Sequence, residues 1–508
     1  MADGTPATSA AHPLADQHAA LDLVSALPED PHQALAGLGA WLEALSSASP
    51  ELALARRIEI VDLLDRSGRD WLNRLQGEFL AGADRSQSSG DEQAWASATD
   101  YLQRLWTAYL DVIRDFQTYC PGWTQVRDKV PTLLARALRA TGLRLKWQLL
   151  RYAPVDKELW FTLTRLWACA EDRGIAATRV QPYEGVETTL QREFLKPLML
   201  AMSAADSLSP KALDIAERIV AQYSGRFELQ RYPSRGCHFF IDLESGAPPS
   251  RFVPGMRVRL GMRFFGPGEA VAVLEALSAS IASEEAIPAE LSLQDVNRVG
   301  EVIEVLEHLT RYWWARRPGR TEERKRAVSK ILVASGYEQL LNKLSAESAV
   351  DLALDDSSET WTVENESESG YGALLPRGAA HWVRVGALLG ARAVDSRIWA
   401  VGVVRRLVAR DDGQRYVGVQ LIGRGARVVA LLRPAESVPA VAAVLLPSHV
   451  GDSVSHGEVT LLLPAGTFSA QATYAMQIYD REYLLEPQLL TESGGDYEIA
   501  HFRIAQHG

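Results

Sequence analysis

The spacing of apolar residues changes part-way along this chain of 508 residues, and that change constrains the fold more than any other feature. The early part contains Leu102, Leu105, Trp106 and Tyr109, with Ile113 and Phe116 continuing the series at intervals of three and four. Such intervals place one apolar stripe along a helix, and the stripe must pack against a neighbour. From about Phe227 the apolar runs become short, β-rich and interrupted by Gly and Pro. The chain is therefore predicted to be an α+β multidomain protein.

The first part is predicted to be an antiparallel helical array. Further helical stripes occupy residues 133–150, 159–167 and 190–202. Ser209 is a suitable N-cap for a further helix, with Pro210 in its first turn. We assign residues 16–226 to a helical domain, and residues 1–15, which contain little to bury, to a mobile arm.

A small α+β domain is predicted for residues 227–310. Its strand-like runs are 239–241, 257–260 and 262–265, and turn residues separate them. Two helical patterns, over 270–281 and 295–313, follow.

The last third is predicted to be antiparallel β structure. Strand-like runs cover 382–389, 398–408, 416–422 and 428–432. The Asp411-Asp412-Gly413 segment predicts a hairpin, because Asp and Gly tolerate the positive backbone angles of tight turns. Consecutive strands without helices indicate a β-barrel. We assign this barrel, with an arginine-rich linker, to residues 311–435.

A C-terminal β-rich domain is predicted for residues 436–508. Its strand-like runs cover 459–463, 467–478 and 483–490.

Composition excludes several classes of protein. A content of 47% hydrophobic and 23% charged residues is ordinary globular material, and a net charge of -11 argues against binding along a nucleic acid polymer. Cys120, Cys169 and Cys237 form no CxxC pair, so neither a disulfide framework nor a thiolate zinc site is indicated. Histidines such as His308 and His381 lack partners at metal-ligand spacing. No signal peptide or apolar run of about 20 residues is visible, so we expect a cytoplasmic protein without membrane insertion.

Arginine is concentrated immediately before the predicted barrel. The basic residues within sixteen positions are Arg311, Arg316, Arg317, Arg320, Arg324, Lys325 and Arg326. A guanidinium group presents a planar fork of donors that matches a phosphate or the edge of guanine. Pro318-Gly319 interrupts the preceding helix pattern, so we expect these arginines on a linker that can fold over a ligand.

A polar motif, Asn365-Glu366-Ser367-Glu368-Ser369-Gly370, lies at the end of a predicted strand. Asn365 and Ser367 offer hydrogen-bonding groups, and Gly370 lets backbone approach a flat or anionic ligand closely. Alternation along a strand predicts that Glu364, Glu366 and Glu368 face away from Asn365 and Ser367.

The two segments together resemble the PilZ family of bacterial cyclic di-GMP receptors, whose pattern is RxxxR on a linker followed by [D/N]xSxxG at a strand end. Arg316 to Arg320 satisfies the first part and Asn365 to Gly370 the second, although Arg320 with Arg324 also fits RxxxR. Segments 399–405 and 416–421 are similar to the paired family strands, with Leu421 in place of the usual aromatic residue. The interval between the two motifs is longer than in the family, and we expect an inserted strand and helix over Ala327–Leu344 followed by an acidic loop over Asp351–Glu359.

The resemblance implies a site for cyclic di-GMP and no other cofactor. The implied ligand-binding residues are Arg316, Arg317, Arg320, Asn365, Ser367 and Gly370. The arginines are expected to contact guanine edges and phosphates, and binding is expected to change how the helical half sits relative to the β half. A protein partner is expected to bind through the helical domain. No GxSxG, HExxH, Walker or Rossmann pattern occurs in a suitable setting, so no enzyme is indicated.

One alternative keeps the fold and discards the ligand. In that interpretation the chain is a scaffold with a degenerate barrel in pilus, flagellar or secretion regulation. The arginine cluster then balances a helix dipole, and the Asn365 to Gly370 motif is only a polar turn.

Overall fold

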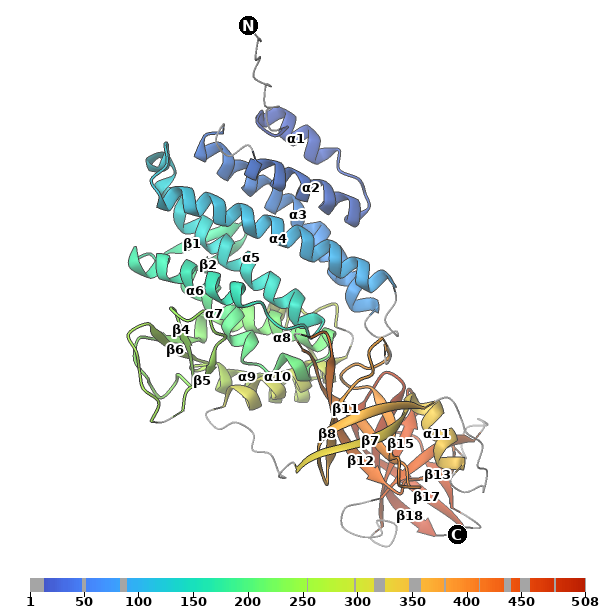
Figure 1. Ribbon diagram of the computed structural model, residues 1–508. Helices are drawn as coiled ribbons and strands as arrows, with labels where there is room; N and C mark the ends of the chain where they lie inside the picture. The colour runs from blue at the N-terminus through green and yellow to red at the C-terminus, as the bar shows by residue number, and fades with distance from the viewer. Residues whose placement is uncertain are drawn as a thin grey trace. The chain divides into compact units, whose positions relative to one another are not determined.

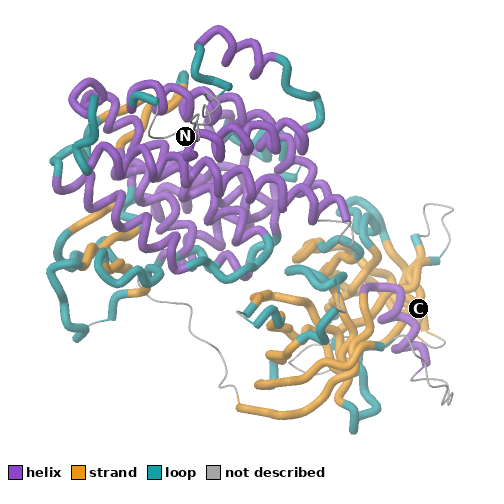
Figure 2. Tube along the Cα trace, turned by 45° about the horizontal axis from the view of Figure 1, so that its top comes forward, coloured by secondary structure: helices purple, strands orange, loops and turns teal. Residues whose placement is uncertain are grey.

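The computed structural model describes residues 13–47, 52–82, 89–253, 255–296, 298–314, 325–346, 358–378, 381–410, 412–433, 440–447, 457–478 and 481–507. The chain divides into two compact units. The first contains Met1–Ala205 and Pro210–Pro318, and the second contains Asp206–Ser209 and Gly319–Gly508. Helix dominates the first unit and strand the second (Figures 1 and 2). The predicted α+β multidomain class, with a helical array and a C-terminal antiparallel barrel, is confirmed, whereas the predicted domain boundaries stay predictions.

The first unit is built on a helical array (Figure 1). Its helices up to residue 223 are α1 (Gln17–Ser25), α2 (Pro31–Ser47), α3 (Leu54–Gly82), α4 (Ser89–Gln117), α5 (Val130–Leu150), α6 (Lys157–Asp172), α7 (Leu190–Ala201) and α8 (Pro210–Tyr223). Helix α4 packs against α2, α3 and α5. Its predicted stripe is buried, including Leu102, Leu105, Trp106 and Tyr109. The spacing of apolar residues therefore identified the packed face correctly.

Two features of this array differ from the sequence analysis. Strands β1 (Arg179–Tyr183) and β2 (Val186–Thr189) form a hairpin between α6 and α7 that was not predicted. Residues 1–12 of the predicted mobile arm lie outside the described residues. Leu14, however, is buried and its carbonyl oxygen accepts a hydrogen bond from Arg56 Nη2 at 2.8 Å. The end of the predicted arm is thus fixed to α3.

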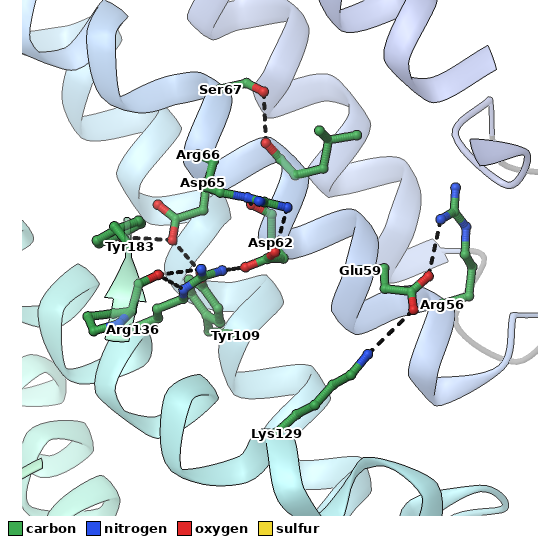
Figure 3. A network of polar contacts seen from close by, with 12 residues as sticks. Arg56, Glu59, Asp62, Asp65, Arg66, Ser67, Tyr109, Lys129, Arg136 and Tyr183 are labelled. Atoms are coloured by element: carbon green, nitrogen blue, oxygen red, sulfur yellow. Dashed lines mark hydrogen bonds and ion pairs between the residues drawn. The ribbon is translucent and has the colours of Figure 1, made fainter. Parts of the chain in front are cut away.

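A buried polar network joins α3 to α4, α5 and β1 (Figure 3). The Asp65 carboxylate accepts hydrogen bonds from Tyr109 Oη and, at 2.8 Å, from Tyr183 Oη. Arg136 donates to the Pro182 carbonyl oxygen and forms an ion pair with Asp62. Burial raises the pKa of the Asp65 carboxyl group, although both tyrosine hydroxyls act in the opposite direction. Separating these elements would leave buried polar groups without hydrogen-bond partners, which costs free energy. The network therefore fixes how α3, α4, α5 and β1 pack together.

A small sheet and two more helices complete the first unit. The strands are β3 (Glu228–Gln230), β4 (Phe239–Asp242), β5 (Ser250–Arg251) and β6 (Met262–Gly266), in the order β3-β6-β4-β5. Helices α9 (Ala270–Glu284) and α10 (Val299–Trp313) follow and pack together. The predicted strand at 257–260 is wrong, since these residues pair with no strand and are exposed.

The second unit begins with a closed antiparallel barrel in the order β10-β11-β12-β9-β8-β7. Its strands are β7 (Lys325–Ser335), β8 (Glu359–Ser367), β9 (Gly370–Leu374), β10 (Leu388–Ala393), β11 (Ala400–Ala409) and β12 (Arg415–Arg424). Helix α11 (Gly336–Ala346) lies between β7 and β8 in the chain, so the predicted insertion is a barrel strand followed by a helix. Gly413 has φ +75° in the hairpin between β11 and β12, as its turn signal predicted.

The rest of the chain forms a second closed barrel, where the sequence analysis predicted only a β-rich domain. Its order is β13-β14-β15-β18-β17-β16. The strands are β13 (Arg427–Leu432), β14 (Val441–Leu446), β15 (Glu458–Pro464), β16 (Tyr474–Ile478), β17 (Arg481–Ser493) and β18 (Tyr497–His507). Strand β13 pairs with β14 and β16, so residues 428–432 belong to this barrel and not to the first.

The two barrels share one apolar core, and α11 contributes to it. The core cluster contains Leu340 of α11, Val401 and Val403 of the first barrel, and Val444 and Tyr497 of the second. Tyr337 Oη donates to the Ala442 carbonyl oxygen at 2.8 Å, and Tyr337 N donates to Asp496 Oδ2 at 2.8 Å. Helix α11 therefore ties the first barrel to the second.

Candidate functional site

The polar motif forms the hairpin between β8 and β9. Ser367 pairs with Gly370, and only Glu368 and Ser369 lie between the two strands. The Ser369 carbonyl oxygen accepts a hydrogen bond from Leu421 N of β12 at 2.8 Å. A Cβ atom at Gly370 would lie 2.1 Å from the Val419 carbonyl oxygen. The motif glycine is therefore required because the hairpin packs directly on the β12 backbone.

Asn365 is held in a polar cluster on the barrel wall. Its Nδ2 donates to Tyr416 Oη at 3.1 Å. The Arg410 guanidinium lies 5.3 Å from the centre of the Tyr416 ring and donates to both oxygens of Glu364, at 3.0 and 2.6 Å. The hydrogen bonds to Glu364 raise the pKa of Arg410. The cluster therefore fixes the Asn365 carboxamide beside a neutralised carboxylate.

The predicted separation of the carboxylates from Asn365 is wrong for Glu364. A register shift between Val363 and Asn365 interrupts the pairing of β8 with β9. Such a bulge breaks the alternation of faces on which the prediction rested. Glu364 and Asn365 consequently reach the same Arg410 and Tyr416 cluster, whereas Glu366 and Glu368 are exposed.

Ser367 and the tip of the hairpin are close to a further arginine. Ser367 is half-buried, and its Oγ lies 3.4 Å from Ser369 Oγ. Arg424 Nη2 donates to the Glu368 carbonyl oxygen at 3.4 Å, and its guanidinium lies 6.0 Å from the centre of the Tyr371 ring. The sequence analysis missed Arg410 and Arg424, because strand register alone brings them to the hairpin.

The predicted arginines Arg316, Arg317 and Arg320 lie outside the described residues. The described chain resumes at β7, and the register of β7 with β8 shows where this chain lies relative to the motif. Lys325 pairs with Glu366, and Arg326 pairs with Asn365. The start of β7 thus runs alongside the motif, and both basic residues are exposed.

Neither a metal centre nor a membrane-spanning helix occurs in the described part of the chain. No group of three or more His, Cys, Asp or Glu residues is arranged there to hold a metal ion. Within the same residues, no helix combines the length and apolarity needed to cross a bilayer.

The helical part of the chain is similar to a known protein family. Residues 18–234 match the family model described as cyclic-di-GMP receptor FimW, N-terminal domain. The match extends from α1 past β3 and includes neither barrel. No curated protein and no solved structure matches the chain.

Proposed function

We propose that this protein is a non-enzymatic receptor for cyclic di-GMP, with the ligand bound at the β8–β9 hairpin of the first barrel. The observation that carries the proposal is the pairing of Lys325 and Arg326 with Glu366 and Asn365. This register brings the chain that follows the arginine cluster to the polar motif. The description of the family model that matches the helical part names the same ligand. The resemblance of the arginine segment and the polar motif to the PilZ pattern adds support of its own.

Covalent geometry supports a two-part site. Arg320 precedes Lys325 by five residues. Five residues span at most about 18 Å even when fully extended. Because Lys325 lies beside Glu366, a ligand on the hairpin is within reach of Arg320. Arg317 and Arg316 precede Arg320 by three and four residues in the sequence. Their guanidinium groups are suited to guanine edges and phosphates.

The electrostatics of the hairpin are compatible with a dianionic ligand. Arg410 neutralises Glu364, one of the two carboxylates that flank Asn365 in the sequence. Glu366 and Glu368 are exposed, where water screens their repulsion of a phosphate. The bond to Tyr416 holds the Asn365 carboxamide in one orientation, which lowers the entropy lost on binding.

Titration calorimetry with cyclic di-GMP tests the proposal. We expect Arg320→Ala and Ser367→Ala each to weaken binding about tenfold or more, because each removes hydrogen bonds to a charged or polar ligand. Arg397→Ala is the matched control, since Arg397 is exposed in the same unit but lies between β10 and β11. Equal affinity of Arg320→Ala and wild type would remove Arg320 from the site.

A thermal melt separates a receptor from the scaffold alternative. A ligand that binds only the native state must raise the melting temperature. We expect cyclic di-GMP to do so and to slow amide exchange in residues 365–372 together with the arginine segment. If wild type shows neither effect, the barrel is a scaffold without this ligand.

We further propose that ligand binding alters how the helical unit engages a protein partner. Such coupling requires only that the ligand bind one conformation of the protein more tightly than another, because binding then shifts the population toward that conformation. Pull-down of a partner with and without cyclic di-GMP, repeated with Arg320→Ala, tests it, since the ligand should change capture by wild type only.

A further inference from the structure

Large apolar side chains are exposed around the small sheet of the first unit. Leu260 is 91% exposed, Tyr232 71% and Val253 61%, and Met256 and Val258 are also exposed. All five lie in the connections between β3 and β4 or between β5 and β6. Clustered apolar exposure of this kind marks an interaction surface.

Ion pairs with Glu171 bring the start of the β3–β4 connection and the end of the β5–β6 connection to the same end of the sheet. The Glu171 carboxylate accepts hydrogen bonds from Arg231 Nε at 3.3 Å and from Arg263 Nε at 3.0 Å. Arg263 Nη1 also donates to the Leu260 carbonyl oxygen at 3.0 Å. Tyr232 follows Arg231 directly, so Tyr232 and Leu260 belong to one surface.

The segment at 255–260 is exposed along its whole length even though its C-terminal end is held. Its apolar residues Met256, Val258 and Leu260 alternate with Arg257 and Arg259. Arg259 forms an ion pair with Asp242, and Leu243 N donates to the Gly261 carbonyl oxygen at 3.0 Å. The apolar side chains therefore face solvent on an anchored connection.

The charge of this region is opposite to that of the whole chain. Residues 231–263 contain six arginines but only two carboxylate side chains, in a protein of net charge -11. Among the described residues, Arg235 and Arg257 make no ion pair. These two arginines occur here together with exposed apolar side chains. Such a surface is complementary to one with an anionic outer layer and an apolar layer beneath it.

We propose that this surface, formed by Tyr232, Met256, Arg257, Val258 and Leu260, docks on an anionic lipid bilayer. The apolar side chains enter the boundary between headgroups and acyl chains, and the guanidinium groups bind lipid phosphates. These apolar side chains fit a bilayer better than a protein partner. A protein would need a separate matching pocket for each side chain as exposed as Leu260, whereas a bilayer needs none. The attachment is peripheral and independent of the proposed nucleotide site.

Vesicle flotation with the full chain tests the proposal. We expect the wild type to bind vesicles of phosphatidylglycerol and phosphatidylcholine, to bind pure phosphatidylcholine at least about tenfold more weakly, and to be released by salt. The double substitution of Val258→Asp with Leu260→Asp should weaken binding at least about tenfold. Arg257→Gln should weaken it about threefold to tenfold. The controls are Val394→Asp, at another exposed apolar site, and Arg179→Gln, at another exposed arginine, and both should bind as wild type.

A second variant reports insertion directly. Leu260→Trp places a fluorophore at the most exposed apolar position of this surface, and we expect its emission to shift to shorter wavelength and to be quenched by brominated lipids. Equal binding of wild type to neutral and anionic vesicles would overturn the proposal, as would an introduced indole that stays unquenched while the Leu260→Trp protein binds vesicles normally. Capture of an acidic protein by this surface without vesicle binding would likewise overturn it.

Discussion

Gly370 shows how one residue of the candidate site is fixed by packing. A methyl group there would collide with the Val419 carbonyl oxygen, and backbone cannot move aside as a side chain can. We expect Gly370→Ala to lower the free energy of unfolding of the second unit by about 1–3 kcal/mol, as overpacking does in cores. Urea unfolding monitored by near-ultraviolet circular dichroism measures the change.

Gly300→Ala is the control for that experiment. Gly300 lies in α10, and a Cβ atom there would meet nothing within 4 Å. Alanine is the better helix former, so this variant should be neutral or more stable by up to about 1 kcal/mol. A Gly370→Ala protein as stable as wild type would show that β12 can retreat from the hairpin.

Asp65 gives stability a dependence on pH. Burial raises the pKa of its carboxyl group above the ordinary value of 3.8, so the native state binds its proton more tightly than the unfolded state. Stability therefore falls as pH rises from about 3.8 through the folded pKa, and is constant above it. Asp65→Asn lacks this titration. We expect the free energy of unfolding of the variant, relative to wild type, to increase across that interval.

Urea unfolding at a series of pH values from about 3.5 to 8 measures this difference. The two proteins are compared by how their free energy of unfolding changes with pH. A change in stability from the amide group that is the same at every pH does not affect this comparison. Asp70→Asn, at an exposed position of the same helix, should retain the wild-type pH dependence. Parallel curves for Asp65→Asn and wild type would contradict the prediction.

At the scale of elements, a buried ion cluster joins α5 to α8. Lys146 Nζ lies 2.7 Å from Asp214 Oδ1 and 3.2 Å from Glu217 Oε2. Burial opposes the charge on Lys146, but Glu217 and Asp214 outweigh it and raise the pKa of the ammonium group. Removing one partner leaves buried carboxylate behind, so Lys146→Met should destabilise the first unit by about 3 kcal/mol at neutral pH.

Thermal and urea unfolding of the first unit measure the effect of Lys146→Met. Lys157→Met, at the exposed start of α6, should change stability by no more than about 0.5 kcal/mol. Similar losses in both variants would mean that the Asp214 cluster does not hold α8.

Several elements were predictable from sequence because their signal is local. The α4 stripe, the β11–β12 turn at Gly413 and the inserted β7 and α11 all depend on neighbouring residues. The pairing of strands has no local signal. The alternation of apolar and polar residues indicates which face of a strand is buried, but not which other strand lies beside it. For that reason β13 was assigned to the wrong barrel, and the segment at 257–260 was mistaken for a strand.

The candidate site divides in the same way. The motif Asn365 to Gly370 was visible as a polar turn, and its hairpin is present. Arg410, Tyr416 and Arg424 come from β12 and its preceding turn, so only the barrel register brings them to it. The bulge before Asn365 has no local sequence signal, and it reversed the expected position of Glu364.

At the scale of the whole molecule, the two barrels are expected to fold as one unit. Arg405 of the first barrel donates to both oxygens of Glu492 in the second, at 2.7 and 2.6 Å, and to Gln420 Oε1 at 2.8 Å. Gln420 is itself paired with Gly370. A continuous set of contacts therefore links the candidate site to the second barrel, in addition to the shared apolar core around α11.

This arrangement predicts different behaviour for two fragments. Residues 319–508 should unfold in one cooperative transition, because they retain the whole shared core. Residues 319–433 should not, because removal of Val444, Leu462 and Tyr497 exposes the apolar face of α11 and leaves Tyr337 Oη without its carbonyl acceptors. Dispersion of amide signals in nuclear magnetic resonance spectra distinguishes the outcomes. A well-dispersed spectrum of the shorter fragment would show that the first barrel is stable by itself and that α11 is not a required link.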